Sequence, residues 1–480
     1  MSGPKRIVFI EPKAPDLHIF SQFPIPRLGI FILGTLMKER GWEVEIVFEE
    51  TRAIDYESLK KADLVGISTI TSTAPRAYAI ADRVRSLGVP VLMGGPHVSF
   101  LADEALEHAD FVIRGEGEVP LKAFIDAWER GGGFASVPSL SYREGGRIVH
   151  NPQAPPVRNM DDIPVPDFAG LRFRAKSIAG RTIIPVQTSR GCPFDCSFCS
   201  VTGMFGKKWR FRSIPHILEE LRRYDARRNF IFFYDDNFAA DPPRAKALLQ
   251  GMIAQRFRFR WSTQVRADAA RDSELVRLMK RAGCHTVFVG FESVNPRSLA
   301  GMKKKQTVED IAQAVRVFRR ERIHVHGMFM FGFDEDDWTT VKQTVRFAKK
   351  ARLTSTQFLI LTPLPGSEFF EKMTAERRIL FRDWSLYDAH HVVFRPARLS
   401  LPSLQRAQSF AHRKFYSLVE IGKRLIRGRW LDLSLAAYAR RLNRLWKKKN
   451  RTFLKVVDLL RPRRNADITV DYRSNVRLDG

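Results

Sequence analysis

The chain has 480 residues, of which 44% are hydrophobic and 28% are charged, and it contains only four cysteines. Such a composition is typical of a folded protein of two or three domains and excludes a disordered or fibrous chain. The few cysteines exclude a disulfide-rich secreted scaffold, so we expect a reducing, cytoplasmic location. The N-terminal residues lack the apolar core of a signal peptide, and no apolar run reaches the roughly 18 residues of a membrane-spanning helix.

The net charge of +28 is distributed unevenly along the chain. Residues 1–150 carry 17 Lys and Arg against 20 Asp and Glu, whereas residues 401–464 carry 18 against 3. More than half of the excess positive charge therefore lies in about one eighth of the chain. A concentration of this kind requires an explanation separate from that of the rest of the chain.

Residues 1–135 alternate apolar strands with amphipathic helices. We predict strands at 6–10, 43–48, 64–69, 89–95 and 111–118, and helices at 28–41, 74–87 and 119–130. Strands separated by helices of this length form a parallel, Rossmann-like sheet with right-handed crossovers. Such a sheet binds ligands at the carboxyl ends of its strands. Because no G-x-G-x-x-G sequence follows the first strand, a dinucleotide is a poor candidate for the ligand.

Polar residues and glycines at these strand ends are the candidates for ligand contacts. Turns rich in glycine and hydroxyl groups let a ligand approach the backbone closely and offer it hydrogen-bond donors. The candidates are Ser68, Thr69, Thr71, Gly94, Gly95, His97 and Glu116.

Residues 136–180 contain short strands near 139–149 and a proline-rich stretch, and we interpret them as a linker. A second α/β series follows over residues 181–375, with strands at 182–189, 230–237, 260–266, 286–293, 325–332 and 356–365. We predict its helices at 214–227, 242–256, 272–282, 307–321 and 338–350. Six β/α units in succession predict a partial (β/α)6 TIM barrel with its active site at the C-terminal strand ends. Residues 376–480 lose the alternation and are predicted to be mostly helical, with helices at 402–427 and 431–459.

Three of the four cysteines, Cys192, Cys196 and Cys199, lie in the sequence CPFDCSFC, directly after a predicted strand. Thiolates are soft ligands that suit iron–sulfur clusters or zinc. A zinc site would need a fourth ligand, and Cys284 and His216 are the candidates, but neither has the paired spacing of a zinc finger. A [4Fe-4S] cluster held by three cysteines keeps one iron open, and that iron can bind and reduce S-adenosylmethionine (SAM).

The C-x3-C-x2-C spacing resembles the signature of the radical SAM superfamily, whose members cleave SAM to a 5′-deoxyadenosyl radical. The resemblance implies a [4Fe-4S] cluster on the three cysteines, with SAM on its open iron. It further implies SAM contacts from Phe198 near the adenine, from Asp235, Asp236 and Asn237 beside the methionyl amine, and from Gln264, Arg266 and Glu292 on the following strands. Cys284 stands at the entrance to a predicted strand, where we expect a small core residue.

An open parallel α/β domain followed by a radical SAM barrel resembles the cobalamin-binding radical SAM enzymes, over about residues 1–400. Similar segments include VGIST at 65–69, GGPHVSF at 94–100, RGEGE at 114–118 and LTPLPGSEFF at 361–370. The resemblance implies that the first sheet holds cobalamin through the strand-end residues named above. The D-x-H-x-x-G pattern that supplies the cobalt ligand in other cobalamin proteins is absent, and His97 and His18 are the histidines near strand ends. The resemblance therefore implies cobalamin without a histidine ligand, and loss of the cofactor is the alternative.

With both cofactors, the resemblance implies methyl transfer to an unactivated carbon of a hydrophobic or natural-product-like small molecule. One SAM would methylate cobalamin, a second would supply the radical, and a flavodoxin or ferredoxin would supply the electron. A cyclisation or rearrangement with the same cofactors is the alternative. A nucleic-acid-modifying enzyme is a third hypothesis, but the related methylthiotransferases carry additional N-terminal cysteines, and residues 1–191 contain none.

Apolar residues interleave with Lys and Arg in the basic segment 401–464, among them Phe415, Tyr416, Leu418, Leu425, Trp430 and Leu431. A basic amphipathic helix of this kind can lie on an anionic membrane surface, and a solvated charged helix face is the alternative. The segment has no recognised nucleic-acid-binding motif. We therefore expect a peripheral contact with the inner membrane face and a lipid-like substrate such as an isoprenoid.

Overall fold

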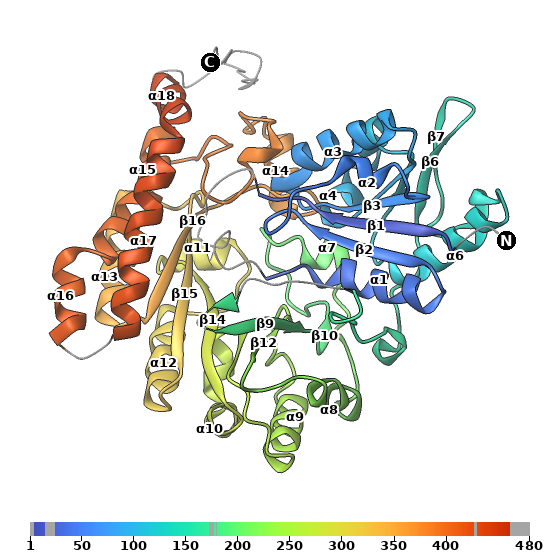
Figure 1. The fold of residues 1–480 in the computed structure, drawn as a ribbon. Helices are drawn as coiled ribbons and strands as arrows, with labels where there is room; N and C mark the ends of the chain where they lie inside the picture. Colours follow the sequence, from blue (N-terminus) through green and yellow to red (C-terminus); the bar gives the residue numbers. More distant parts are fainter. Residues whose placement is uncertain (1–3, 15–24, 172–176, 179, 427–429, 461–480) are drawn as a thin grey trace. The chain divides into compact units, whose positions relative to one another are not determined.

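The computed structural model describes residues 4–14, 25–171, 177–178, 180–426 and 430–460 (Figure 1). Contacts divide the chain into two compact units. The first comprises Met1–Pro15, Pro24–Gly191 and Ser200–Tyr224, and the second comprises Asp16–Phe23, Cys192–Cys199 and Asp225–Gly480. The domain boundaries predicted at residues 135, 180 and 375 are finer than this division and stay predictions. His18, one of the two histidines considered for cobalt, lies outside the described residues.

The first unit contains a seven-stranded sheet with the strand order β2-β1-β3-β4-β5-β6-β7. Strands β1 to β5 run parallel, whereas β6 and β7 are antiparallel and extend the sheet beyond β5. The short strands predicted within 136–180 therefore belong to this sheet. The seven strands are β1 Arg6–Glu11, β2 Glu43–Phe48, β3 Leu64–Ser68, β4 Val91–Gly94, β5 Phe111–Ile113, β6 Leu140–Glu144 and β7 Arg147–His150.

Helices connect the parallel strands and cover both faces of this sheet, with α1 packed on α6 and α3 packed on α5 (Figure 1). Because both faces are covered, the strands are nearly continuous apolar runs, and β1 buries five of its six residues. The predicted Rossmann-like sheet is confirmed. The helices are α1 Leu28–Glu39, α2 Tyr56–Leu59, α3 Ala74–Ser86, α4 Pro96–Phe100, α5 Ala102–His108 and α6 Glu118–Glu129. The first unit also contains β8 Ser177–Ile178, β9 Arg181–Val186, β10 Ser189–Arg190, β11 Arg210–Phe211, α7 Val201–Phe205 and α8 Ile214–Arg222.

The second unit contains five parallel strands that pair in sequence order from β12 to β16. They are β12 Asn229–Phe233, β13 Trp261–Val265, β14 Cys284–Glu292, β15 His324–Phe331 and β16 Ser355–Ile360. The helices are α9 Pro242–Ala254, α10 Ser273–Arg281, α11 Pro296–Gly301, α12 Val308–Arg320, α13 Trp338–Lys350 and α14 Glu368–Ala375. With β9, all six strands predicted for the partial barrel are present, each followed by its predicted helix or by the end of the series.

Side chains alternate between the two faces of strands β12 to β16. One face packs beneath the helices, and Val289, Phe291, Phe329 and Phe358 on that face have no exposed surface. The opposite face, which we name the inner face, combines apolar side chains with polar ones. It carries Phe232, Gln264, Phe288, His326, Met328, Met330, Ser355, Gln357 and Leu359.

The C-terminal region is helical, as predicted, with α15 Leu401–Phe415, α16 Leu418–Ile426, α17 Trp430–Lys449 and α18 Arg451–Leu459. Among the described residues, no helix combines the length and the apolar character needed to cross a bilayer. Phe415 and Tyr416, which the sequence suggested as membrane-facing, are instead 1% and 2% exposed. Their burial results from the packing of α15 on β16.

Side chains from the C-terminal end of α15 form hydrogen bonds with backbone groups along the free edge of β16. The Tyr416 hydroxyl accepts the Thr356 N–H and donates to the Thr356 carbonyl, both at 2.9 Å. His412 Nε2 accepts the Phe358 N–H at 3.4 Å, and burial lowers the pKa of His412 to about 4, which leaves the imidazole neutral and able to accept. An edge strand otherwise presents unpaired backbone groups that pair with other chains. The first C-terminal helix is therefore an integral part of the half-barrel.

Replacing Tyr416 by phenylalanine is expected to leave both backbone groups of Thr356 without their partner, at a cost of about 1–3 kcal/mol. Hydrogen exchange of a peptide spanning 355–360 should become about tenfold faster or more, because β16 opens locally. Tyr142→Phe is the matched control, since the Tyr142 hydroxyl is buried without a hydrogen bond to any described residue. Equal exchange in wild type and Tyr416→Phe would contradict the edge-capping role.

Candidate functional site

The cysteine loop, residues 192–199, lies in the second unit. Cys192, Cys196 and Cys199 are each half-buried, and none forms a disulfide. The Cys199 N–H donates to the Cys196 carbonyl at 3.0 Å, which folds the loop back on itself. Burial raises the pKa of Cys192, with Asp236 and Cys196 adding to that effect. A bound cationic centre reverses this tendency, because metal ligation favours the thiolate.

The cysteines suit a cluster better than a single ion. No group of three or more His, Cys, Asp and Glu residues within the described part of the chain is arranged to hold one metal ion. In a cubane each thiolate binds a different iron, so its ligands need not converge on one point. Cys284, considered as a zinc ligand, is 1% exposed at the start of β14, and burial raises the pKa of its thiol. His216, the other zinc candidate, has Nδ1 3.0 Å from an Asp161 carboxylate oxygen.

Arg266 fixes the first half of the cysteine loop. Its guanidinium lies 3.7 Å from the centre of the Phe194 ring, a close cation–π contact. Its Nη2 donates to the Lys304 carbonyl at 2.6 Å and its Nε to Asp268 at 3.2 Å. Arg266 was predicted to contact SAM, and the structure places it between the cysteine loop and the loop that contains Lys304. It thereby orients the segment that carries Cys192 and Cys196.

Backbone bonds and aromatic packing hold the second half of the loop. The Ser197 N–H donates to the Met302 carbonyl at 3.3 Å, and its carbonyl accepts the Phe369 N–H at 2.8 Å. The Phe198 ring lies edge-on to Phe333, with centroids 6.1 Å apart. Segments that follow β14 and β16 thus fix a loop that has no regular structure of its own.

The predicted SAM contacts on β12 and β13 come together after these strands end. The Phe238 N–H donates to the Gln264 carbonyl at 3.1 Å, which ties the two strand ends together. Asp235 is fully buried and Asp236 is exposed. Asn237 is 3% exposed, and its Oδ1 accepts no hydrogen bond from any described residue. A buried acceptor of this kind suits a donor such as the methionyl amine, so the residues present fit SAM.

Glu292 forms a buried ion pair that the sequence did not reveal. Lys304 Nζ lies 2.7 Å from Glu292 Oε1, and both side chains are about one tenth exposed or less. Glu292 has a φ of 61°, an uncommon conformation that occurs often at functional sites. Its side chain folds back over Gly290, where a Cβ would collide with the carboxylate. Lys304 also lies 5.9 Å from the Phe198 ring, so the pair adjoins the cysteine loop.

The carboxyl edge of the first sheet combines several predicted cobalamin contacts. The parallel order β2-β1-β3-β4-β5 places a switch point between β1 and β3, where ligands of such sheets bind. Thr69 Oγ1 donates to the Gly94 carbonyl at 2.8 Å. Gly95 has a φ of 103°, and a Cβ there would collide with the Thr69 carbonyl. Only glycine allows this close approach, and the resulting small-residue edge fits a flat, bulky ligand such as a corrin.

Glu11 and Arg27 lie at the same switch point, and the sequence analysis missed them. The Arg27 N–H donates to Glu11 Oε2 at 3.0 Å, and Arg27 Nη1 donates to the Ser68 carbonyl at 3.2 Å. Burial raises the pKa of Glu11, and the charge of Arg27 opposes that rise. The residues are far apart in sequence, so only the register of β1 and β3 could have indicated this group.

The side chains of His97 and Glu116 contact other residues of the chain. His97 has no exposed surface and lies in helix α4 rather than in a loop, and its Nε2 is 3.6 Å from Glu104, which favours a buried structural histidine over a cobalt ligand. Glu116 pairs with Arg210 at 2.9 Å and with Arg190 at 3.2 Å. Burial would raise the pKa of Glu116, but the two guanidinium groups hold it below its usual value. Thr71 is 8% exposed in a short 3-10 turn, and Ser68 is half-buried.

Comparison with known proteins identifies two domains in this chain. Residues 186–348 match the radical SAM superfamily, and residues 20–125 match the B12 binding domain. An uncharacterized methyltransferase of Pyrococcus horikoshii is 31% identical over 404 residues, which cover 82% of this chain and 88% of the relative. The chain belongs to the cobalamin-binding radical SAM enzymes. The expected cofactors of this radical SAM enzyme, a [4Fe-4S] cluster, SAM and cobalamin, are thereby confirmed.

Further relatives of this enzyme have named reactions or solved structures. Bacteriochlorophyllide d C-12(1)-methyltransferase of Chlorobaculum tepidum is 28% identical, over 88% of this chain and 89% of the relative. The structure of TsrM from Kitasatospora setae has a TM-score of 0.66 at 21% identity and covers 78% of each chain. The structure of OxsB has a TM-score of 0.69 at 18% identity and covers 95% of this chain and 75% of its own. Both structures confirm the predicted α/β fold with its partial barrel.

When bound, the cluster and SAM supply a carbon-centred radical, and cobalamin carries a methyl group. The residues of this chain would hold the cofactors and shield the reaction from water. Cys192, Cys196 and Cys199 would hold the cluster, and Arg266, stacked on Phe194, keeps their loop in place. The inner face would lie around the reacting carbon and keep water away from it.

Replacing Cys192, Cys196 or Cys199 by alanine is expected to remove one cluster ligand. After anaerobic reconstitution, bound iron should fall and 5′-deoxyadenosine formation from SAM should drop to background. Cys284→Ala is the matched control, because this buried thiol lies on β14 and is not part of the loop. The control should keep its iron and its 5′-deoxyadenosine formation. Formation of 5′-deoxyadenosine by any loop variant at the wild-type rate would refute the cluster assignment.

Proposed function

We propose that this enzyme transfers a methyl group, through methylcobalamin, to an unactivated carbon of a hydrophobic small molecule. The observation that carries the proposal is the chemistry of the inner face, in the same unit as the cysteine loop. Its apolar side chains are Phe232, Phe288, Met328, Met330 and Leu359. Thioether and aromatic groups adapt to a bulky apolar ligand and do not hydrogen-bond a polar one strongly.

Two polar residues on the inner face would orient such a substrate. Burial lowers the pKa of His326 to about 4, so the imidazole is neutral. Its Nδ1 lies 2.8 Å from Ser355 Oγ, and its Nε2 has no hydrogen-bond partner among the described residues. The amide of Gln357 is fully buried next to this imidazole, and its interaction with His326 partly offsets the lowering of the His326 pKa. Groups of this kind suit a single oxygen function on a mostly apolar molecule.

The relatives support a hydrophobic substrate. One is named a bacteriochlorophyllide d C-12(1)-methyltransferase, and another, from Methylococcus capsulatus, is named a hopanoid C-3 methylase and is 28% identical over 88% of this chain. An isoprenoid or other lipid-like molecule is therefore the substrate class we propose. The electron would come from a flavodoxin or ferredoxin.

Ring closure is the second candidate function. The anaerobic magnesium-protoporphyrin IX monomethyl ester cyclase of Cereibacter sphaeroides is 26% identical over 86% of this chain. The two reactions differ in the fate of the SAM methyl group, which reaches the product only in methyl transfer. That difference makes them separable by isotope labelling.

The test uses protein reconstituted anaerobically with iron, sulfide and hydroxocobalamin. We expect methylcobalamin from SAM with a trideuterated methyl group, and a product three mass units heavier than with unlabelled SAM when lipid extracts serve as the substrate source. A protein that binds no corrin would refute methyl transfer and leave the radical chemistry intact. A product that forms without the label would favour cyclisation or rearrangement.

We also propose that helix α16 mediates a peripheral contact with the inner face of an anionic membrane. Leu418, Val419, Leu425 and Ile426 on this helix are 69%, 67%, 47% and 87% exposed. Residues seven apart lie on the same face of a helix, so the four form one stripe. Lys423 beside it pairs with Glu420 at 3.2 Å, and the wider segment 401–464 is strongly basic. An apolar stripe with basic neighbours is typical of helices that lie at a lipid interface. The side chains of Trp430 and Leu431 lie outside the described set.

Replacing Leu418 and Val419 by aspartate should abolish flotation with phosphatidylglycerol vesicles, because the change puts charge into the apolar stripe. Val119→Asp is the control, since Val119 is an apolar residue 48% exposed on α6. Vesicles of phosphatidylcholine alone should bind the wild type weakly. If the Leu418 and Val419 variant floats as well as the Val119 variant, α16 does not make the membrane contact.

A further inference from the structure

A cavity of about 380 Å³ lies among helices α15, α17 and α18 and the first residue of α13. Its volume falls within the roughly 300–1,000 Å³ of small-molecule sites. The apolar part of its lining is formed by Trp338, Phe410, Trp446, Leu454 and Val457. No lining residue belongs to the cysteine loop or to strands β12–β16, so the cavity is separate from the radical site.

The charged part of the lining is positive. Arg406 pairs with Asp458 at 2.6 Å, which neutralises both. Arg413 and Lys447 also line the cavity, and neither has an acidic partner among the described residues. Burial lowers the pKa of Lys447, and the charge of Arg413 lowers it further. Arg413 is exposed and Lys447 is half-buried, and together they give this part of the lining a positive charge that attracts an anion.

The indole of Trp446 supplies a third donor. Trp446 is 4% exposed, and its Nε1 has no hydrogen-bond partner within the described part of the chain. A buried indole N–H usually has an acceptor, so its absence at a cavity wall indicates a ligand acceptor. Trp446 therefore lines the same cavity as the two cations and carries a buried N–H that has no partner among the described residues.

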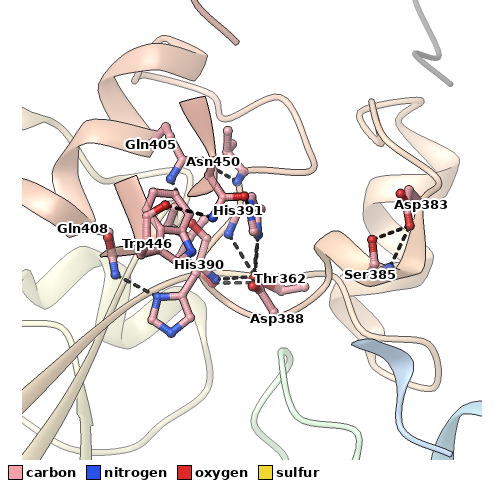
Figure 2. A network of polar contacts seen from close by, with 12 residues as sticks. Thr362, Asp383, Ser385, Asp388, His390, His391, Gln405, Gln408, Trp446 and Asn450 are labelled. Carbon is pink, nitrogen blue, oxygen red and sulfur yellow. Dashed lines mark hydrogen bonds and ion pairs between the residues drawn. The ribbon is translucent and has the colours of Figure 1, made fainter. Parts of the chain in front are cut away.

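The wall behind Trp446 is fixed by a polar network (Figure 2). Gln405 Nε2 donates to the His390 carbonyl at 2.8 Å. His391 Nε2 lies 3.0 Å from Asn450 Oδ1, and Asn450 Nδ2 donates to the Trp446 carbonyl at 3.1 Å. These bonds hold Gln405, one of the lining residues, and Asn450 in place, so this part of the wall loses little further freedom when a ligand binds.

We propose that this cavity binds an anionic amphiphile, a molecule with one aliphatic chain and a carboxylate or phosphate head. The head would lie between Arg413 and Lys447 and accept the Trp446 N–H, and the chain would lie along Trp338 and Leu454. A nucleic acid would need a row of cations for successive phosphates, whereas here the cations are few and the remaining lining is mostly apolar. The proposal does not depend on methyl transfer.

The test is calorimetric titration of the full-length protein with dodecanoate below its micelle concentration. We expect saturable binding, at least about tenfold tighter than that of dodecyltrimethylammonium, because only the anion pairs with the two cations. Inorganic phosphate should not displace dodecanoate, because it lacks the chain. A chain-terminal brominated fatty acid should quench tryptophan fluorescence, and less so in Trp338→Phe.

Charge reversals locate the site. Arg413→Glu and Lys447→Glu should each weaken dodecanoate binding about tenfold or more. Lys448→Glu is the matched control, because Lys448 is exposed, adjacent in sequence and absent from the lining, and it should change binding less than about twofold. Circular dichroism and bound iron report whether each variant folds. The proposal fails if folded variants bind like wild type, if the cationic amphiphile binds equally well, if phosphate displaces dodecanoate, or if no saturable binding occurs.

Discussion

The guanidinium of Arg266 lies on the ring of Phe194 and donates to the backbone of Lys304, and this contact helps to fix the loop that carries the three cysteines. The cysteine loop has no helix or strand to fix its shape, yet three thiols must meet one cluster. Its shape comes from β13 through Arg266, from the segment after β14 through Met302 and from the segment after β16 through Phe369. Segments that follow strands of the parallel sheet thus fix the loop that would hold the cluster, and the buried pair of Glu292 and Lys304 adjoins the same loop.

A half-barrel differs from a closed barrel in having a free strand edge. Helix α15 supplies Tyr416 and His412 to the backbone of β16, and Ala389 accepts the Ile360 N–H at 2.8 Å. The same helix provides Gln405 and Arg413 to the cavity among the C-terminal helices. The basic C-terminal region therefore has three distinct parts: a face that completes the sheet, a cavity with unpaired cations, and an apolar stripe on α16.

The sequence predicted elements that depend on local pattern. Apolar periodicity located the parallel strands of the two large sheets, although the predicted ends of β5 and β16 lie five residues too far along the chain and the short strands β8 and β11 were missed. The cysteine spacing alone indicated the cluster. Contacts between distant segments were not predictable in this way. Arg27 and Ser68 are 41 residues apart and meet only because β1 and β3 are neighbours. Lys304 lies in a run of three lysines that looks solvated, yet it is buried against Glu292. Tyr416 looked membrane-facing because an aromatic residue among lysines has the same pattern whether it covers lipid or a strand edge.

The capping of β16 by α15 affects the tendency of the chain to aggregate. A shortened chain that ends before Leu401 would leave the N–H and C=O groups of Thr356 and the N–H of Phe358 exposed along a flat, apolar strand. Such an edge is a template for strand addition from a second copy. The C-terminal helices thereby protect the protein against self-association, and loss of this region would first appear as precipitation rather than as a change in catalysis.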